Sequence, residues 1–293
     1  MNGIIIADKP AGWTSHDVVA KLRNVLQIKR VGHGGTLDPI ATGVLPIFIG
    51  RATRAAEFCV GADKEYVAGL KLGLVTDTQD ITGNTISACE VSISAKELTD
   101  IIKCFLGNQK QIPPMYSAVK VGGKKLYEIA RRGGDIERAP RDVFISDIEL
   151  IEGDGSDFLL RIVCSKGTYI RTLCNDIGAS LGCGGTMSSL RRIRAGSFTE
   201  DKAHTLEEML DAVSAGETEK IIIPVDSVFS EFPAITLNEA EARKCKNGAP
   251  SYQTRTDLEG KYRFYGPNGE FLMLGEVKSG IIRTIKNFYE IRK

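Results

Sequence analysis

A glycine-rich loop carries the group best suited to chemistry in this chain, the carboxylate of Asp38. The loop, expected over residues 31–43, contains Gly32-His33-Gly34-Gly35-Thr36-Leu37-Asp38-Pro39. Glycines allow positive φ and let a large ligand approach the backbone closely, and a following proline holds Asp38 in extended dihedrals. We therefore expect a carboxylate presented from a constrained loop. By itself, an aspartate in such a loop is more often a turn former than a catalyst.

Two further segments concentrate cationic side chains. Residues 164–171 include Lys166, Tyr169 and Arg171, at an expected strand-to-helix junction where free backbone N–H groups can face an anion. A guanidinium there could pair with a distant carboxylate and keep it ionised, or it could simply be a surface cation at a helix start. Residues 190–194 hold three arginines, which alone are a weak nucleic-acid signal.

Several common catalytic signatures are missing. The glycine spacing matches neither a dinucleotide-binding GxGxxG nor a P-loop. The sequence has no GxSxG elbow, HExxH motif or kinase signature, and it lacks the paired cysteines of a zinc deaminase. Seven cysteines without a CxxC pair, together with three histidines, favour neither a disulfide framework nor a structural zinc site.

The elements that must position these segments follow from capping and periodicity. We expect strands at 3–7, 44–49, 64–74, 143–152 and 157–165, the last two joined by a turn at 153–156. Helices are expected after Thr14, near 51–60, after Ser94, from 168 to 181, at 205–214 and at 238–247. Because strands and helices alternate without a strict βαβ rhythm, the pattern predicts an α+β fold.

Length and composition describe an ordinary soluble protein of two domains. The chain has 293 residues, of which 42% are hydrophobic and 26% charged, and a domain commonly has about 100–200 residues. It shows neither the roughly 18 apolar residues of a membrane span nor a signal peptide. We therefore expect a cytoplasmic protein and no membrane association. Pro224 and Pro233 bracket the predicted boundary between domains at 1–230 and 234–293.

Charge is clustered although the net charge is +1. Residues 119–141 carry seven basic side chains against three acidic ones, and 278–293 carry five against one, whereas 200–219 carry seven acids against one lysine. Such clusters suit nucleic-acid binding or merely solvated faces. The first cluster lies within 107–141, a stretch without clear periodicity that is typical of a functional insertion.

Four stretches, taken in order, resemble the bacterial tRNA pseudouridine-55 synthase (TruB) family. They are residues 8–15, residues 32–46, Lys64-Glu65-Tyr66 with Thr76-Asp77-Thr78 and Asp80 downstream, and residues 165–171 followed by Leu190-Arg191-Arg192. The resemblance implies an isomerase that converts uridine 55 in the T-loop of tRNA to pseudouridine, without a metal or organic cofactor. It also implies the pseudouridine synthase fold, a central mixed, mostly antiparallel sheet with flanking helices and a cleft.

The resemblance assigns roles residue by residue. Asp38 falls on the catalytic aspartate, Arg171 on its salt-bridge partner, and Tyr66 on the tyrosine that stacks on the flipped base and relays a proton. Substrate contacts are implied for Lys9, His33, Asp80, Lys166, Tyr169 and Leu190, with His33 filling the space left by the extruded base. The basic stretch 113–141 matches an insertion that closes over the RNA loop, with phosphate contacts expected from Lys120, Lys124, Lys125, Arg131, Arg132 and Arg141.

The implied reaction suits these residue types. The N1–C1′ bond must break, the uracil must turn, and C5 must bond to C1′, after the base has been flipped out at a cost of roughly a few kcal/mol. A carboxylate could attack C1′ as a nucleophile or help remove a C2′ proton to give a glycal-like intermediate. The sequence leaves both routes open.

Two other functions stay open. One is an RNA-binding module without catalysis, which would gain little from a carboxylate at Asp38 beside Arg171. The other is a nucleoside or RNA glycosidase. Such enzymes usually deploy two carboxylates or a metal to activate water, whereas the core motif here has one carboxylate.

The C-terminal part, 234–293, resembles a small, β-rich PUA-like RNA-binding domain. The resemblance rests on its position, on the helix capped by Gly248, and on Tyr262–Tyr265 with glycines between short strands. The basic residues Arg283, Lys286, Arg292 and Lys293 favour RNA contact, but a β-subdomain that merely packs on the catalytic domain fits equally well. Without a long extension or basic tail, we expect a stand-alone monomer that binds the T-arm and T-loop of tRNA and needs no obligate protein partner.

Overall fold

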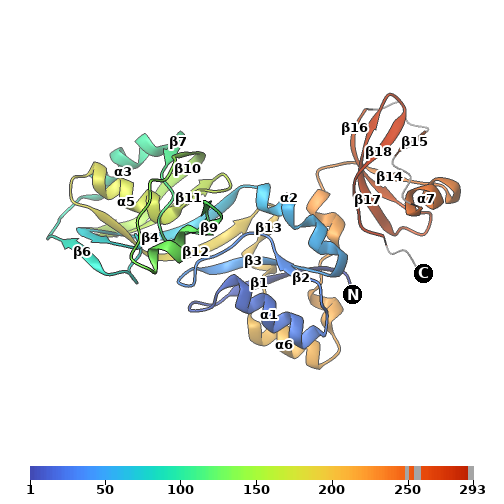
Figure 1. Cartoon of the computed structure of the whole chain (residues 1–293), viewed down its shortest axis with the longest axis horizontal. Helices are drawn as coiled ribbons and strands as arrows, with labels where there is room; N and C mark the ends of the chain where they lie inside the picture. Colours follow the sequence, from blue (N-terminus) through green and yellow to red (C-terminus); the bar gives the residue numbers. More distant parts are fainter. Residues whose placement is uncertain (248–250, 254–258, 290–293) are drawn as a thin grey trace.

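One large mixed sheet organises most of the chain in the computed structural model, which describes residues 1–247, 251–253 and 259–289 (Figure 1). Its strands are β1 (Gly3–Lys9), β2 (Val31–His33), β3 (Thr42–Ile49), β4 (Lys64–Leu72), β7 (Gly107–Gln111), β10 (Arg141–Asp154), β11 (Asp157–Cys164), β12 (Gly185–Ala195) and β13 (Phe198–Thr199). The path runs β1-β3-β12-β4-β11-β10-β7, with β2 beside β3 and β13 beside β12. β3 and β12 pair in parallel and their neighbours pair antiparallel. The predicted α+β class with a mostly antiparallel mixed sheet is confirmed.

Three of the four longer helices of this part begin at the capping residues that the sequence predicts, and α5 (Ile170–Ser180) begins without a side-chain cap. The other three are α1 (Ser15–Leu26), α3 (Ala95–Ile102) and α6 (Leu206–Ser214). Thr14, Ser94 and Thr205 each accept a hydrogen bond from the backbone N–H three residues on, and an acidic side chain at that position bonds back. These capping boxes satisfy backbone donors that a helix start would otherwise leave unpaired.

Strand β1 is buried on both faces, which explains its unbroken apolar run. Ile5 and Ala7 enter a core that includes Leu22 of α1. Ile4 and Ile6 enter a second core on the opposite face, because successive side chains of a strand point to opposite sides of the sheet. The start of the chain is therefore fixed at the edge of the sheet, close to the loop that carries Asp38.

Two predicted boundaries are wrong for backbone reasons. The strand expected over 64–74 ends at Leu72, because Gly73 turns the chain with φ of +77°, and the next residues form a separate hairpin of β5 (Leu74–Thr76) and β6 (Thr85–Ala88). The insertion expected over 107–141 is shorter, since β7 and Arg141 pair within the large sheet. Its projecting part, residues 112–140, contains β8 (Lys120–Val121), β9 (Lys124–Lys125) and α4 (Leu126–Ala130).

The described residues of the C-terminal part form a second sheet with one helix, as predicted. The strands β14 (Ala234–Thr236), β15 (Ser251–Gln253), β16 (Gly260–Tyr265), β17 (Phe271–Lys278) and β18 (Ile281–Asn287) order as β14-β16-β17-β18-β15, and the helix is α7 (Glu239–Lys246). The predicted cap at Gly248 and the basic residues Arg292 and Lys293 lie outside the described residues.

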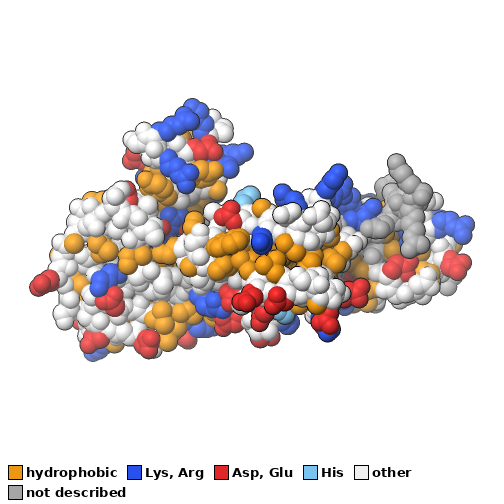
Figure 2. Space-filling model, turned by 90° about the horizontal axis from the view of Figure 1, so that it is seen from below, with side chains coloured by type: hydrophobic (Ala, Val, Ile, Leu, Met, Phe, Trp, Pro, Cys, Tyr) orange, Lys and Arg blue, Asp and Glu red, His pale blue; other side chains and the backbone are white. Residues whose placement is uncertain are grey.

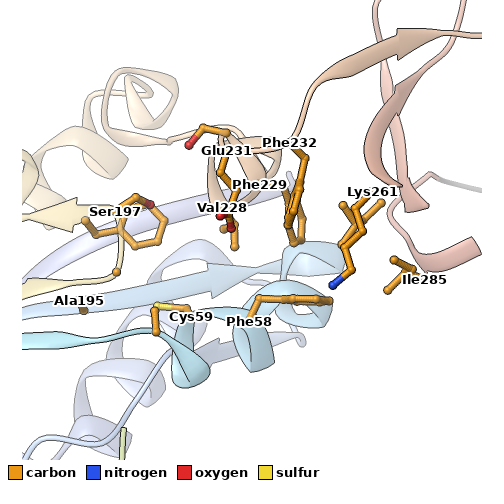
Figure 3. A pocket seen from close by; sticks show the side chains of 15 residues that line it. Phe58, Cys59, Ala195, Ser197, Val228, Phe229, Glu231, Phe232, Lys261 and Ile285 are labelled. Carbon is orange, nitrogen blue, oxygen red and sulfur yellow. The ribbon is translucent and has the colours of Figure 1, made fainter. Parts of the chain in front are cut away.

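This second sheet packs against η1 (Gly50–Ala55) and α2 (Ala56–Gly61) of the first part, and against η5 (Val225–Phe229). The ring of Phe229 lies 5.6 Å from that of Phe288, and Arg54 donates a hydrogen bond of 3.1 Å to the Asn287 carbonyl. A cavity of about 400 Å³ remains at the junction, with Phe58, Phe229 and Lys261 among its lining residues (Figure 3).

Candidate active site

Asp38 lies in the connection between β2 and β3, which the start of α1 holds in place. The Leu37 N–H donates to Ser15 Oγ at 2.8 Å, and the Ser15 hydroxyl lies 3.2 Å from the Leu37 carbonyl. Leu37 and Ser15 are both buried. The Asp38 side chain, one residue on, is 38% exposed. The loop therefore anchors the residue before the carboxylate and leaves the carboxylate open.

Two glycines of this loop allow it to pack on the sheet. A Cβ at Gly34 would lie 2.8 Å from the ring of Phe48, and one at Gly43, whose φ is +96°, would lie 2.3 Å from the Arg192 carbonyl oxygen. At these two positions the small residue admits a neighbouring part of the protein. These contacts within the protein, and not the expected approach of a ligand, require glycine there.

Arg171, on the first turn of α5, connects Asp38 to the turn at 78–80 and to the segment that carries Tyr116. Its Nε lies 2.9 Å from Asp38 Oδ2, and its Nη1 lies 3.5 Å from Asp80 Oδ2. Nη1 also donates to the Thr78 carbonyl at 3.0 Å, and Nη2 donates to the Tyr116 carbonyl at 2.8 Å. The guanidinium is buried, and its planar fork of donors fixes the position of the carboxylate relative to these segments.

Asp80 lies behind Arg171 and is absent from the cleft wall. It is buried, and its Oδ1 accepts hydrogen bonds from the Thr78 and Thr82 hydroxyls at 3.0 and 2.5 Å. Asp80 therefore supports the arginine, and its contact with substrate stays a prediction.

Lys9 supports the Asp38 loop from within the protein. Its ammonium donates to the carbonyls of Pro10, Trp13 and Pro39 at 2.9, 2.6 and 3.3 Å, and the residue is buried. Burial lowers the pKa of Lys9 to about 8, against the opposing charge of Asp38. Like Asp80, Lys9 does not line the cleft. It positions the loop, and its contact with substrate stays a prediction.

A cleft of about 290 Å³ opens beside Asp38. Six of the predicted site residues line it: Asp38, Tyr66, Lys166, Tyr169, Arg171 and Leu190. Ser117 and Ala118 of the insertion line it as well. The larger cavity at the junction with the second sheet (Figure 3) is mainly apolar, and no aspartate or arginine lines it. The smaller cleft is therefore the candidate active site.

Tyr66 lies near the start of β4, with its hydroxyl kept in the phenol form. Burial raises its pKa, and the nearby Arg192 guanidinium acts in the opposite direction. Arg192 is itself buried and donates to the carbonyls of Val44 at 2.7 Å and Gly35 at 3.1 Å. The arginine thus connects the strand that carries Tyr66 to the loop that carries Asp38.

The arginines at 191, 192 and 194 have partners within the protein. Arg191 forms ion pairs with Asp8 and Glu200, each at 3.0 Å, and Arg194 pairs with Glu65 at 2.9 Å. The charges of this run therefore neutralise acids around β12, and a role in nucleic-acid binding stays a prediction.

His33 ends β2 and does not line the cleft. Its ring meets that of His16 edge to face at 5.3 Å, and its buried Nδ1 has no hydrogen-bond partner among the described residues. Burial, assisted by the charge of His16, lowers the pKa of His33 to about 4. The ring is therefore neutral near pH 7, and its role beside an extruded base stays a prediction.

The predicted phosphate-binding residues lie mostly on the projecting insertion. Lys120, Lys124, Arg131 and Arg132 are exposed. Lys125 and Arg131 stand over the Tyr127 ring at 5.3 and 5.5 Å. Arg141 is exposed but begins β10 in the large sheet. Figure 2 shows basic side chains gathered on the projecting segment, whereas acidic ones gather along the opposite edge of this face.

Sequence reasoning missed two buried supports of the cleft. The Gln111 side chain accepts from the Tyr169 N–H at 3.0 Å and donates to the Tyr169 carbonyl at 3.3 Å. Lys64, which lines the cleft, donates to the carbonyls of Cys59 and Val60 at 3.3 and 2.6 Å. The Lys64-Glu65-Tyr66 motif could have indicated the lysine. Nothing local indicates Gln111.

Other features of the described residues bear on what the protein could hold. No three His, Cys, Asp or Glu side chains lie together in a group that could bind a metal ion. Within the same residues, no helix is long and apolar enough to cross a membrane.

Comparison with known proteins decides the family. The N-terminal domain of the TruB family pseudouridylate synthases matches residues 23–170, and the C-terminal domain of tRNA pseudouridylate synthase B matches residues 171–230. The chain belongs to the TruB family. The TruB relatives include a tRNA pseudouridine synthase B from Azoarcus sp. (strain BH72), 44% identical over 97% of this chain and 93% of that protein. Another, from Alkaliphilus oremlandii (strain OhILAs), is 48% identical over 86% of this chain and 83% of that protein.

Solved structures agree with the TruB assignment. The fold matches a chain of a Cbf5-Nop10-Gar1 complex with a TM-score of 0.75 and 29% identity, over 98% of this chain and 85% of that one. The protein is therefore a pseudouridine synthase, an isomerase.

Proposed function

We propose that this TruB-family protein isomerises uridine 55 in the T-loop of tRNA to pseudouridine, with Asp38 as the catalytic carboxylate. The observation that carries the proposal is the 2.9 Å contact between Asp38 and Arg171 in a cleft that Tyr66, Tyr169 and Leu190 also line. The relatives that are named tRNA pseudouridine synthase B support tRNA as the substrate.

Different residues of the cleft serve different steps of the reaction. The target uridine leaves its stack and enters the cleft, because a stacked base cannot be reached in place. Tyr66, Tyr169 and Leu190 hold the uracil, while Arg171 pairs with the Asp38 carboxylate at 2.9 Å and fixes its position. Asp38 attacks C1′, or it helps remove the C2′ proton. In either route the N1–C1′ bond breaks, the uracil turns, a C5–C1′ bond forms, and the C5 proton leaves.

Phosphate contacts position the RNA in this account. Lys120, Lys124, Lys125, Arg131 and Arg132 of the insertion and Arg141 of β10 meet the backbone of the T-arm, which fixes orientation without reading sequence. The shape of the loop and its splayed bases then supply selectivity. Lys166, exposed on the cleft wall, meets the target nucleotide.

We assign residues 1–230 to a catalytic domain and 234–293 to a small PUA-like domain that adds RNA contact. The enzyme acts as a monomer in the cytoplasm, where its tRNA substrates are. This assignment rests on the separate second sheet and on the exposed basic side chain of Arg283 in β18. Lys286 of the same strand pairs with Glu57 of α2.

The test uses two tRNA transcripts, one unmodified and one with cytidine in place of uridine 55. Pseudouridine is mapped by carbodiimide adducts that stop reverse transcription. We expect a single stop at position 55 in the first transcript and none in the second. A stop elsewhere would contradict the T-loop assignment. Release of free uracil would indicate a glycosidase, and tight binding of unchanged tRNA would indicate a binding module.

A further inference from the structure

Ser117, at the base of the insertion, has a buried hydroxyl without a partner. The residue is 4% exposed, and its Oγ is shielded from solvent with no hydrogen-bond partner among the described residues. Most buried polar side-chain atoms in proteins have a partner, because leaving one unpaired disfavours the folded state. The unpaired hydroxyl therefore calls for an explanation, and its position suggests one.

The backbone on either side of Ser117 is held by two hydrogen bonds. Arg171 Nη2 donates to the Tyr116 carbonyl at 2.8 Å, and the Tyr127 N–H donates to the Ser117 carbonyl at 3.0 Å. Because Arg171 also contacts Asp38, one guanidinium fixes both the catalytic carboxylate and the segment that carries the serine. The serine therefore occupies a defined place relative to the reacting centre.

Two other hydroxyls of the cleft wall, those of Ser165 and Thr168, already have partners. Ser165 Oγ accepts from the Phe144 N–H at 2.9 Å, and the Thr168 hydroxyl donates to the Ser165 carbonyl at 2.9 Å. Ala118, which also lines the cleft from the insertion, has no polar side-chain atom. Of these four wall residues, Ser117 alone has a hydroxyl without a hydrogen-bond partner within the described structure.

We propose that Ser117 is a substrate-binding residue whose hydroxyl forms a hydrogen bond with the extruded uridine when the insertion closes over the RNA. The inference rests on the proposed function. A hydroxyl both donates and accepts, so it can pair with a carbonyl of uracil or with a ribose hydroxyl. An unpaired group in the free protein becomes paired in the complex, and the insertion consequently favours the RNA-bound arrangement.

This role makes stability and activity respond in opposite directions to loss of the hydroxyl. Ser117→Ala removes an unpaired buried polar atom, so the Tm of the free protein should stay the same or rise by a few degrees. It also removes one hydrogen bond to the substrate, so kcat/KM on unmodified tRNA transcript should fall about fivefold to tenfold. A hydroxyl with a structural role would instead lower the Tm when removed.

The matched control is Ser146→Ala on β10. The Ser146 hydroxyl is exposed and donates to the Val163 carbonyl at 3.1 Å, and Ser146 does not line the cleft. We expect the control to keep the kcat/KM of the wild type. Unchanged kcat/KM in Ser117→Ala, or a lower Tm, would overturn the inference while wild-type turnover upholds the proposed function. A wild type that forms no pseudouridine in the transcript would overturn both.

Discussion

The Nε atom of Arg171 lies 2.9 Å from Oδ2 of Asp38, which joins the loop after β2 to the first turn of α5. The same guanidinium lies 3.5 Å from Asp80. The Asp38 side chain is 38% exposed and that of Asp80 is 7% exposed. The buried carboxylate thus compensates the buried cation, and the more open carboxylate remains available to a substrate.

Loss of Arg171 should lower both stability and activity, and the two effects can be separated. Arg171→Met leaves Asp80 buried without its cation, so the free energy of unfolding should fall by about 3–5 kcal/mol. The double variant Arg171→Met with Asp80→Asn removes the unpaired charge and should recover much of that loss without recovering activity. Urea unfolding and turnover on tRNA transcript measure the two effects. A double variant as unstable as Arg171→Met would show that Asp80 does not compensate the arginine.

Lys9 should leave a signature in the pH dependence of stability. Burial lowers its pKa from 10.5 to about 8 in the folded protein. Between these values the unfolded chain binds more protons, so this group makes the free energy of unfolding rise with pH. Below about pH 8 the folded protein carries the full cost of burying the charged ammonium. The unfolding free energy of the wild type minus that of Lys9→Met should therefore rise from pH 8 towards pH 10 in urea titrations. A constant difference would argue against a buried ammonium.

The starting points of the helices, such as Thr14 with Asp17, could be predicted because capping depends on residues close in sequence. The burial of Lys9 and Asp80 could not be predicted, because both residues were assigned from motifs and their partners lie in other segments. Strand β12 was missed for a related reason. Its arginines look solvent-exposed in sequence, and only the fold reveals their partners Asp8 and Glu65.

Cations of the insertion should set the salt dependence of RNA binding. If Lys120 and Arg131 each neutralise one phosphate, Lys120→Gln and Arg131→Gln should each reduce the slope of log affinity against log salt concentration by about one. Filter binding of tRNA transcript over a salt series measures the slope. Lys220→Gln is the control, since Lys220 pairs with Glu217 at 2.7 Å away from the insertion. Slopes equal to that of the wild type would exclude phosphate contact by these residues.

The hydroxyl of Tyr66 is the group predicted to relay a proton. Tyr66→Phe keeps the ring that holds the base, so tRNA affinity should stay close to that of the wild type. The single-turnover rate should fall by about 100-fold, the low end of general acid–base contributions. Rapid quench with excess enzyme separates this rate from product release. A near-normal rate would remove the hydroxyl from the mechanism.

The most direct measurement follows tritium from uridine C5 of unmodified tRNA transcript, with wild-type protein and with Asp38→Asn. Forming the C5–C1′ bond expels the C5 hydrogen to water. The account predicts about one equivalent of tritium from the target uridine per tRNA with the wild type, and no release with Asp38→Asn although the variant still binds tRNA. Equal release by the two proteins would contradict Asp38 as the catalytic carboxylate.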